Sequence, residues 1–219
     1  TVIVATGAQY RKLDLPELDR YEGVGVSYAA TQAEAQLCAG DRVLIVGGGN
    51  SAGQAAMFLS QHAASCHLMI RGDDLNKSMS RYLIDELERR QQVQVHTNRQ
   101  IVELQGEPAL EAVTIKDTRT GDREELEVRA LFVFVGASPR TDWLSGHVAM
   151  DEHCFLLVGR DVPDEHLAAF GGERPLFLET SLPGVFAVGD VHSGSIKRVA
   201  SAVGEGSMAV RLVHQRLGT

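Results

Sequence analysis

Between residues 42 and 97, short apolar runs alternate with stretches whose apolar residues recur every three or four positions. The runs at 42–50, 66–70 and 93–97 are typical of buried strands, and the first of them passes into glycines. The stretches at 51–63 and 78–90 are typical of helices. In the second helix, one face carries the apolar residues Met79, Leu83, Ile84 and Leu87. Strand, helix, strand, helix and strand with short loops predict half of a doubly wound, Rossmann-like α/β domain.

After residue 97 the apolar positions change to a period of two. The segments "RQIVELQG", "LEAVTIKD" and "EELEVRA" alternate and are separated by turns such as "RTGDR" at 119–123, which predicts an antiparallel meander. Fully apolar runs at 131–136 and 184–190 predict two further buried strands. Residues 137–175 are expected to be loops and short irregular structure, and residues from about 196 to 217 a closing helix.

The first eight residues, "TVIVATGA", have the pattern of a buried strand that ends in a tight turn at Thr6 and Gly7. Chain ends are usually polar and frayed, so an apolar strand at the first residue is unusual. The pattern raises the question of which strands this one lies beside.

Composition narrows the class of protein. The chain has 219 residues, of which 44% are apolar and 23% charged, as in an ordinary soluble globular protein. A net charge of −8 argues against a nucleic-acid partner, and no apolar run reaches the roughly 18 residues that a membrane helix needs. Cys38, Cys66 and Cys154 form no C-x-x-C pair, and the eight histidines are scattered, so neither a metal site nor a disulfide framework is indicated. Unpaired thiols suit the reducing cytoplasm.

The glycine-rich stretch "GGGNSA" fits the pattern G-x-G-x-x-A and lies between a predicted strand and a predicted helix. Gly47 would permit the tight turn, Gly49 would let the backbone approach a pyrophosphate, and Ala52 would allow close packing of helix on strand. The helix N-terminus offers unpaired N–H groups to an anion. A dinucleotide site is the preferred interpretation, and a merely structural turn is the alternative. The predicted cofactor-binding residues here are Gly47, Gly48, Gly49, Asn50, Ser51 and Ala52.

The end of the next strand, "MIRGDD", bears on which nucleotide binds. NAD sites usually carry an acidic residue here, whereas this chain has Arg71, which suits a 2′-phosphate and favours NADP. Lys77 could add positive charge, while Asp73 and Asp74 would repel a phosphate. The alternative is that Arg71 is a solvated residue at a strand end.

Four motifs together resemble the low-molecular-weight thioredoxin reductase family. They are "VIVATGA" near the start, "GGGNSA", "FVGASP" at 134–139 and "TSLPGVFAVGDV" at 180–191, in the order and at about the spacing of that family. The resemblance covers nearly the whole chain. It implies an FAD domain that is interrupted by an inserted NADPH domain.

The resemblance also implies a set of boundaries and flavin contacts. Residues 1–11 and 138–219 would belong to a second, Rossmann-like FAD domain, and residues 12–137 would form the NADP-binding domain. Asp190 would hold the ribityl chain of FAD. The family's N-terminal G-x-G-x-x-G is absent, so the chain is expected to be a truncated portion of a longer, homodimeric flavoenzyme and to be inactive alone. The further residues expected near FAD are Thr6, Gly7, Gly136, Ala137, Gly189, Lys197, Arg198 and Val199.

One departure from the family bears on function. Where thioredoxin reductases carry a C-x-x-C, this chain reads "SYAATQ", with Ala29 and Gln32 at the two cysteine positions. Neither side chain can exchange electrons through a mixed disulfide. The expected protein is therefore an FAD-dependent, NADPH-oxidising oxidoreductase without a dithiol relay, which passes electrons to a redox protein or a quinone. The alternatives are an NADP(H)-sensing regulatory module, with a fused regulatory domain, and an enzyme similar to ferredoxin–NADP reductase.

Overall fold

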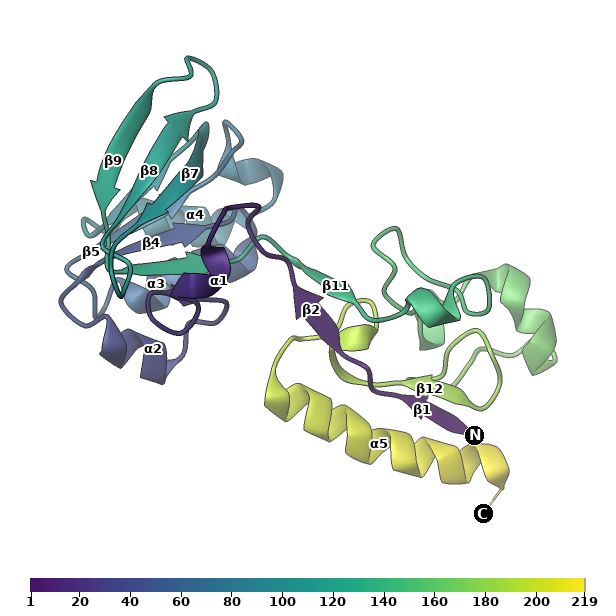
Figure 1. The fold of residues 1–219 in the computed structure, drawn as a ribbon. Coiled ribbons are helices and arrows are strands. Elements are labelled where there is room, and N and C mark those ends of the chain that lie inside the picture. The colour runs from purple at the N-terminus through teal and green to yellow at the C-terminus, as the bar shows by residue number, and fades with distance from the viewer. Residues whose placement is uncertain (219) are drawn as a thin grey trace. The chain divides into compact units, whose positions relative to one another are not determined.

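The computed structural model describes residues 1–218, and the chain divides into two compact units (Figure 1). Unit 1 consists of Thr1–Gln9 and Ala137–Thr219, and unit 2 of Tyr10–Gly136. The chain passes from unit 1 to unit 2 near residue 9 and returns near residue 136, so unit 2 is an insertion within unit 1. No helix in the described residues is long and apolar enough to cross a lipid bilayer.

Unit 2 is built on a five-stranded sheet whose paired strands are all parallel, which confirms the predicted α/β class. Its strand order is β3 (Val26–Ser27), β10 (Ala130–Val133), β4 (Arg42–Val46), β5 (Ser65–Met69) and β6 (Val93–His96). The helices that connect these strands are α3 (Asn50–Leu59) after β4 and α4 (Arg81–Glu88) after β5. Both helices are shorter than the stretches 51–63 and 78–90 that their periodicity predicts. The short helices α1 (Leu18–Tyr21), α2 (Gln32–Leu37) and η1 (Leu75–Lys77) complete the unit outside its β-meander.

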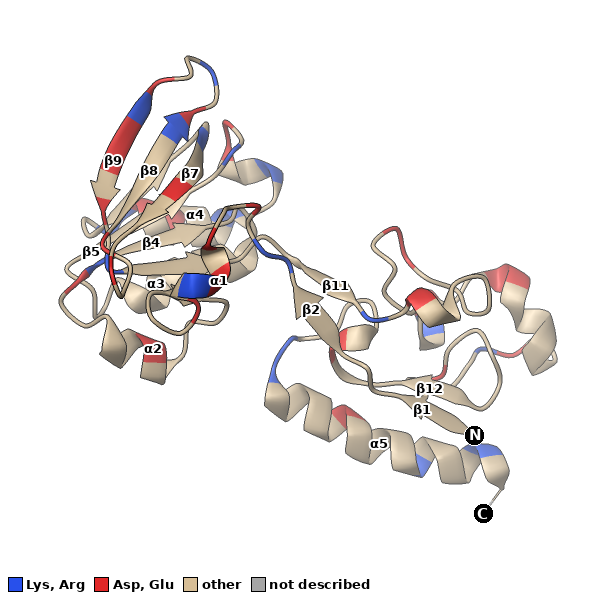
Figure 2. Ribbon diagram, viewed as in Figure 1, with Lys and Arg blue, Asp and Glu red and all other residues tan. Residues whose placement is uncertain are grey.

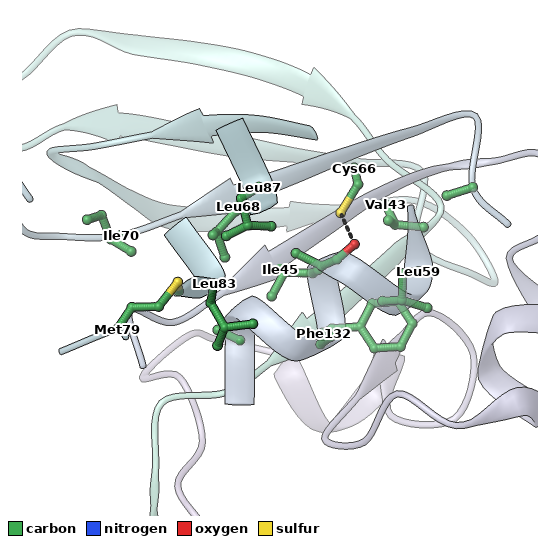
Figure 3. Packing of buried hydrophobic residues seen from close by; sticks show 14 of the residues in the cluster. Val43, Ile45, Leu59, Cys66, Leu68, Ile70, Met79, Leu83, Leu87 and Phe132 are labelled. Carbon is green, nitrogen blue, oxygen red and sulfur yellow. Dashed lines mark hydrogen bonds between the residues drawn. The ribbon is translucent and has the colours of Figure 1, made fainter. Parts of the chain in front are cut away.

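Alternate side chains of β4 and β5 pack on opposite sides of this sheet. Val43 and Leu68 belong to the core cluster shared with α3 and α4 (Figure 3), whereas Leu44 and Met69 belong to a second cluster. The helices approach each other closely, because a Cβ added at Gly53 of α3 would lie 3.3 Å from Cδ1 of Leu83 in α4. Both faces of the sheet are therefore covered within unit 2 itself.

The second core cluster includes the predicted antiparallel meander, which the structure confirms. Its strands are β7 (Arg99–Gln105), β8 (Ala112–Asp117) and β9 (Arg123–Glu127). Alternation places Ile101 and Ile115 in the core, while β9 is acidic and largely exposed. Charge on this outer strand discourages pairing with further strands.

Unit 1 has much less regular structure. Its strands are β1 (Val2–Val4) and β12 (Val185–Ala187), which pair in parallel, and β11 (Ala137–Pro139), which pairs with β2 (Ala8–Tyr10) at the boundary of the units. Its one long helix is α5 (Val199–Leu217). Short 3-10 helices fill the remainder: η2 (Asp142–Leu144), η3 (Gly159–Asp161), η4 (Asp164–Phe170) and η5 (Gly189–Val191).

The structure corrects three predictions for unit 1. The opening strand is not buried throughout, because Val2 and Ile3 are 54% and 41% exposed and only Val4 is buried. The predicted strand at 184–190 ends at Ala187, because the positive φ of Gly189 turns the backbone into η5, which contains Asp190. The closing helix begins at Val199 rather than near 196.

Candidate dinucleotide site

The glycine-rich loop lies at the carboxyl edge of the parallel sheet of unit 2. Strand β4 ends at Val46, and helix α3 begins at Asn50 with Gly49 as its N-cap. The loop is tied to the neighbouring strand β5, because the Gly47 N–H donates to the Met69 carbonyl at 3.1 Å. No side chain caps α3, and the Ala52 N–H donates to the Gly49 carbonyl, so the N–H groups of Asn50 and Ser51 are the ones available to an anion.

The structure shows different reasons for two of the glycines. Gly47 has φ +149°, and a Cβ there would lie 2.3 Å from the Phe134 carbonyl oxygen, so the fold itself requires glycine. Gly49 has φ −90°, and the nearest atom to an added Cβ is the Ser78 carbonyl oxygen at 3.9 Å. The protein would accept a side chain at position 49. The bare backbone at Gly49 therefore leaves room for a ligand, as close approach to a pyrophosphate requires.

The other loop residues hold the site together. Ala52 is fully buried and lies next to Gly47, where a larger side chain would disturb the turn. The Gly48 carbonyl accepts a hydrogen bond from the Ser78 hydroxyl at 2.9 Å, and the Asn50 Oδ1 accepts one from the Ser80 N–H at 2.7 Å. Ser51 is exposed in the first turn of α3.

Ser78 and Ser80 were missed as residues of the site by reasoning from the sequence. A serine just before a helix indicates an N-cap, which gives no hint that the glycine loop is its partner.

Arg71 lies two residues beyond the end of β5. Because Val46 pairs with Met69, Arg71 follows its strand by the same number of residues as Gly48 follows β4. Its side chain is exposed, and within residues 1–218 it forms no ion pair. A guanidinium in this position is free to meet an anionic group of a ligand.

The charged side chains near Arg71 already have partners within the segment that follows it. The Lys77 ammonium lies 2.6 Å from the Asp73 carboxylate, whose pKa is lowered chiefly by that hydrogen bond. Asp74 accepts the Asn76 N–H at 2.8 Å and so caps η1. The repulsion expected from Asp73 is therefore largely offset by Lys77.

The residues expected near FAD lie in unit 1, apart from Gly136. Asp190 is partly exposed in η5, and the N–H of the preceding Gly189 donates to the Glu205 carboxylate at 2.6 Å. The Thr6 hydroxyl donates to the Arg140 carbonyl at 3.0 Å, and the Gly7 carbonyl accepts the Arg140 N–H at 3.1 Å.

The segment leading into α5 is basic (Figure 2), because Arg198 is the N-cap of that helix and Lys197 precedes it. The Lys197 ammonium lies 4.5 Å from the centre of the Phe155 ring and forms a cation–π contact with it. Val199 is 83% exposed. Ala137 opens β11 in unit 1, whereas Gly136 belongs to unit 2.

The positions at which the resemblance implies two cysteines are occupied by Ala29 and Gln32. Ala29 precedes α2, and Gln32 begins that helix behind the N-cap Thr31. Burial raises the pKa of the Cys38 thiol and raises that of Cys66 to about 12, so both are unreactive near neutral pH. Cys154 is exposed. Across residues 1–218 no group of three or more metal-ligating side chains is assembled.

Comparison with known proteins identifies the class to which this fold and loop belong. Residues 1–206 match the model of the pyridine nucleotide-disulphide oxidoreductase family. The chain belongs to that family. The resemblance to thioredoxin reductases is confirmed by relatives and solved structures.

A thioredoxin reductase of Streptomyces clavuligerus is 33% identical over 208 residues, which cover 95% of this chain and 59% of the relative. A 34.2 kDa protein in the rubredoxin operon of Clostridium pasteurianum is 29% identical, over 99% of this chain and 64% of its own length. The thioredoxin reductase structure from Giardia duodenalis has a TM-score of 0.79 at 27% identity, with 99% of this chain and 65% of that one covered. The chain thus spans about three fifths of the curated relatives named.

Proposed function

We propose that unit 2 binds NADP(H) at the loop of Gly47 to Ala52, and that the whole protein is an FAD-dependent, NADPH-oxidising oxidoreductase. Residues 12–137 form the proposed NADP-binding domain, and residues 1–11 with 138–219 contribute to an FAD domain. The observation that carries the proposal is the open backbone at Gly49, which the fold does not require to be glycine. The names of the thioredoxin reductases among the relatives support it.

The residues present fit the proposed cofactors in separate ways. The uncapped first turn of α3 would hold the pyrophosphate of the dinucleotide, and Arg71 would pair with its 2′-phosphate. Asp190 is partly exposed and would accept hydroxyl groups of the ribityl chain of FAD. When bound, the flavin supplies the site at which the nicotinamide hydride is accepted. Lys197, Arg198 and Val199 would lie along the isoalloxazine edge.

We propose that electrons leave such a protein without a dithiol relay at Ala29 and Gln32, toward a redox protein or a quinone. Two buried, unreactive thiols and the absence of a C-x-x-C fit a reducing compartment such as the cytoplasm. The missing relay also favours a second candidate, in which the nucleotide domain senses NADP(H) and signals to a partner. Steady NADPH oxidation with an artificial acceptor would distinguish the enzyme from the sensor.

The nucleotide site is tested by a matched pair of glycine variants. Calorimetry with NADP⁺ and NAD⁺ should show a preference for NADP⁺ in the wild-type chain, and Arg71→Ala should remove that preference. Gly49→Ala should weaken binding of both nucleotides by about tenfold or more, because a methyl group displaces phosphate from the backbone donors. It should lower stability by less than about 1 kcal/mol, the cost of alanine at a helix N-cap.

Gly47→Ala should instead destabilise unit 2 by more than about 1 kcal/mol, because its φ and the Phe134 carbonyl exclude a side chain. A wild-type preference for NAD⁺ would contradict the assignment of NADP. Full nucleotide binding by Gly49→Ala would contradict the site itself.

A further inference from the structure

The segment from Gly72 to Ser80 connects β5 to α4 and is attached to the glycine loop by two polar contacts. The Ser78 hydroxyl donates to the Gly48 carbonyl at 2.9 Å, and the Ser80 N–H donates to the Asn50 Oδ1 at 2.7 Å. The buried side chains of Leu75 and Met79 anchor the same segment in the core. The apolar side chains of the segment are therefore fixed in the core, while its two serines contact the glycine loop and the start of α3.

This segment and Arg71 form the end of the site that would meet a 2′-phosphate. Its start is held by β7 and the turn before it, because the Asn98 N–H donates to the Gly72 carbonyl at 2.8 Å. Lys77 is paired with Asp73 in a contact where both side chains are about two-thirds exposed. An ammonium has three N–H donors, so Lys77 can bind a phosphate while it still offsets the charge of Asp73.

We propose that Ser78 is a positioning residue that sets the preference for a dinucleotide bearing a 2′-phosphate. The proposal rests on the proposed NADP(H) site. A ligand with two anionic groups gains from both only when their two protein partners keep a fixed spacing before binding. The Ser78–Gly48 hydrogen bond maintains this spacing, because it joins the backbone that would hold the pyrophosphate to the segment carrying Lys77 and following Arg71.

A purely structural role for Ser78 predicts a different result. If the hydroxyl only stabilised the start of α4, its loss would lower stability and would weaken NADP⁺ and NAD⁺ equally. If it sets the position of the 2′-phosphate partners, its loss lowers affinity for NADP⁺ alone, because NAD⁺ has no group at that end of the site.

The experiment compares three variants of the full chain by calorimetry with NADP⁺ and with NAD⁺. Ser78→Ala should weaken NADP⁺ binding about three- to tenfold, as expected for one hydrogen bond, and change NAD⁺ binding less than about twofold. Ser78→Thr keeps the hydroxyl and should stay within about twofold of wild type for both nucleotides. Ser145→Ala is the control, because Ser145 is exposed in unit 1 and belongs to no proposed site, and it should leave both affinities unchanged.

A cycle with Arg71→Ala completes the test. In that background Ser78→Ala should have a clearly smaller effect on NADP⁺ than in the wild type, because one of the two partners that it positions has been removed and only Lys77 remains. Equal weakening of both nucleotides by Ser78→Ala, or an undiminished effect in the Arg71→Ala background, would overturn the proposal. If the wild-type chain binds neither nucleotide, the proposed NADP(H) site itself is wrong, and that outcome is distinguishable from the other two.

Discussion

Two helices, one in each unit, are covered by their surroundings to very different extents. Helix α3 of unit 2 has ten residues, five of which are buried between the sheet and α4. Helix α5 of unit 1 has nineteen residues, and Ala209 is its only buried residue. The core of unit 2 is thus formed by its own elements, whereas most of α5 lies outside any core formed by the described residues.

The exposed surface of α5 is apolar along one side. Val203, Val210 and Leu217 recur every seven residues and are 68%, 54% and 58% exposed. Such spacing places side chains on one helical face. The sequence of α5 therefore has the pattern of a helix packed on both sides, while the described residues of unit 1 cover one side only.

Unit 1 therefore depends on particular polar contacts more than unit 2 does. Its two core clusters are small, and a small apolar core contributes little net stability. The carboxylate of Glu179 is fully buried and accepts four hydrogen bonds from three groups. It accepts hydrogen bonds from the N–H groups of Leu176 and Gly184 and from the Arg216 guanidinium near the end of α5.

The largest effect is expected for Glu179→Ala. The change leaves Arg216 and two backbone N–H groups without their acceptor and should destabilise unit 1 by about 3–5 kcal/mol. Unit 2 should keep its stability, because the hydrogen-bond partners of the Glu179 carboxylate belong to unit 1. Denaturation followed by the fluorescence of Trp143, the single tryptophan and a residue of unit 1, measures the first effect. Hydrogen exchange of β4 and β5 measures the second.

Glu173→Ala provides the control, because Glu173 lies in the same region with an exposed side chain. It should change stability by less than about 0.5 kcal/mol. A loss of protection in β4 and β5 of Glu179→Ala equal to that in α5 would show that the two units unfold together, against the comparison drawn above.

The sequence predicted unit 2 better than unit 1, for a physical reason. Short apolar runs, glycines and helical periodicity are local signals, and in unit 2 the strands and helices that they predict pack on one another. An apolar run carries no information on what covers it, so the exposure of Val2 and Ile3 could not be foreseen. The turn at Gly189 was missed because the run "GVFAV" continues into it without a polar break.

The candidate site was predictable in part. The pattern of Gly47, Gly49 and Ala52 was sufficient to locate the loop, because each glycine acts through its own backbone. The bond between Ser78 and Gly48 joins residues 30 positions apart, and no local pattern specifies it. Tertiary contacts of this kind required the structure.

A second prediction concerns acid, to which unit 2 should be sensitive through His67. Burial, then the charge of His96, then Arg42 lower the pKa of His67 to about 4. In the unfolded chain His67 binds a proton as the pH falls below about 6.5, whereas in the folded chain it stays neutral until the pH approaches 4. Its contribution to stability is therefore fully present above pH 6.5 and is lost as the pH falls toward 4. Between pH 7 and pH 5 the free energy of unfolding of unit 2 should fall by about 2 kcal/mol from this group.

The measurement is denaturation at both pH values, followed by exchange of the amides of β5. His67→Gln should reduce the difference between pH 7 and pH 5 by most of that amount, because glutamine does not titrate. His153→Gln is the control, since His153 is exposed in unit 1. An unchanged pH dependence in His67→Gln would show that other groups of unit 2 cause its acid sensitivity.

The smallest effect is expected on the apolar face of α5. Val203→Ser removes an apolar side chain that is 68% exposed, so the free energy of unfolding should change by less than about 0.5 kcal/mol. The measurement is denaturation followed by Trp143 fluorescence at two protein concentrations that differ by a hundredfold. If this face is uncovered in solution, the small effect is the same at both concentrations. A cost above about 1 kcal/mol that shrinks on dilution would show that a second copy of the chain buries Val203, because association contributes stability that depends on concentration. That result would mean that both helices are packed, α3 by elements of its own chain and α5 by a second copy.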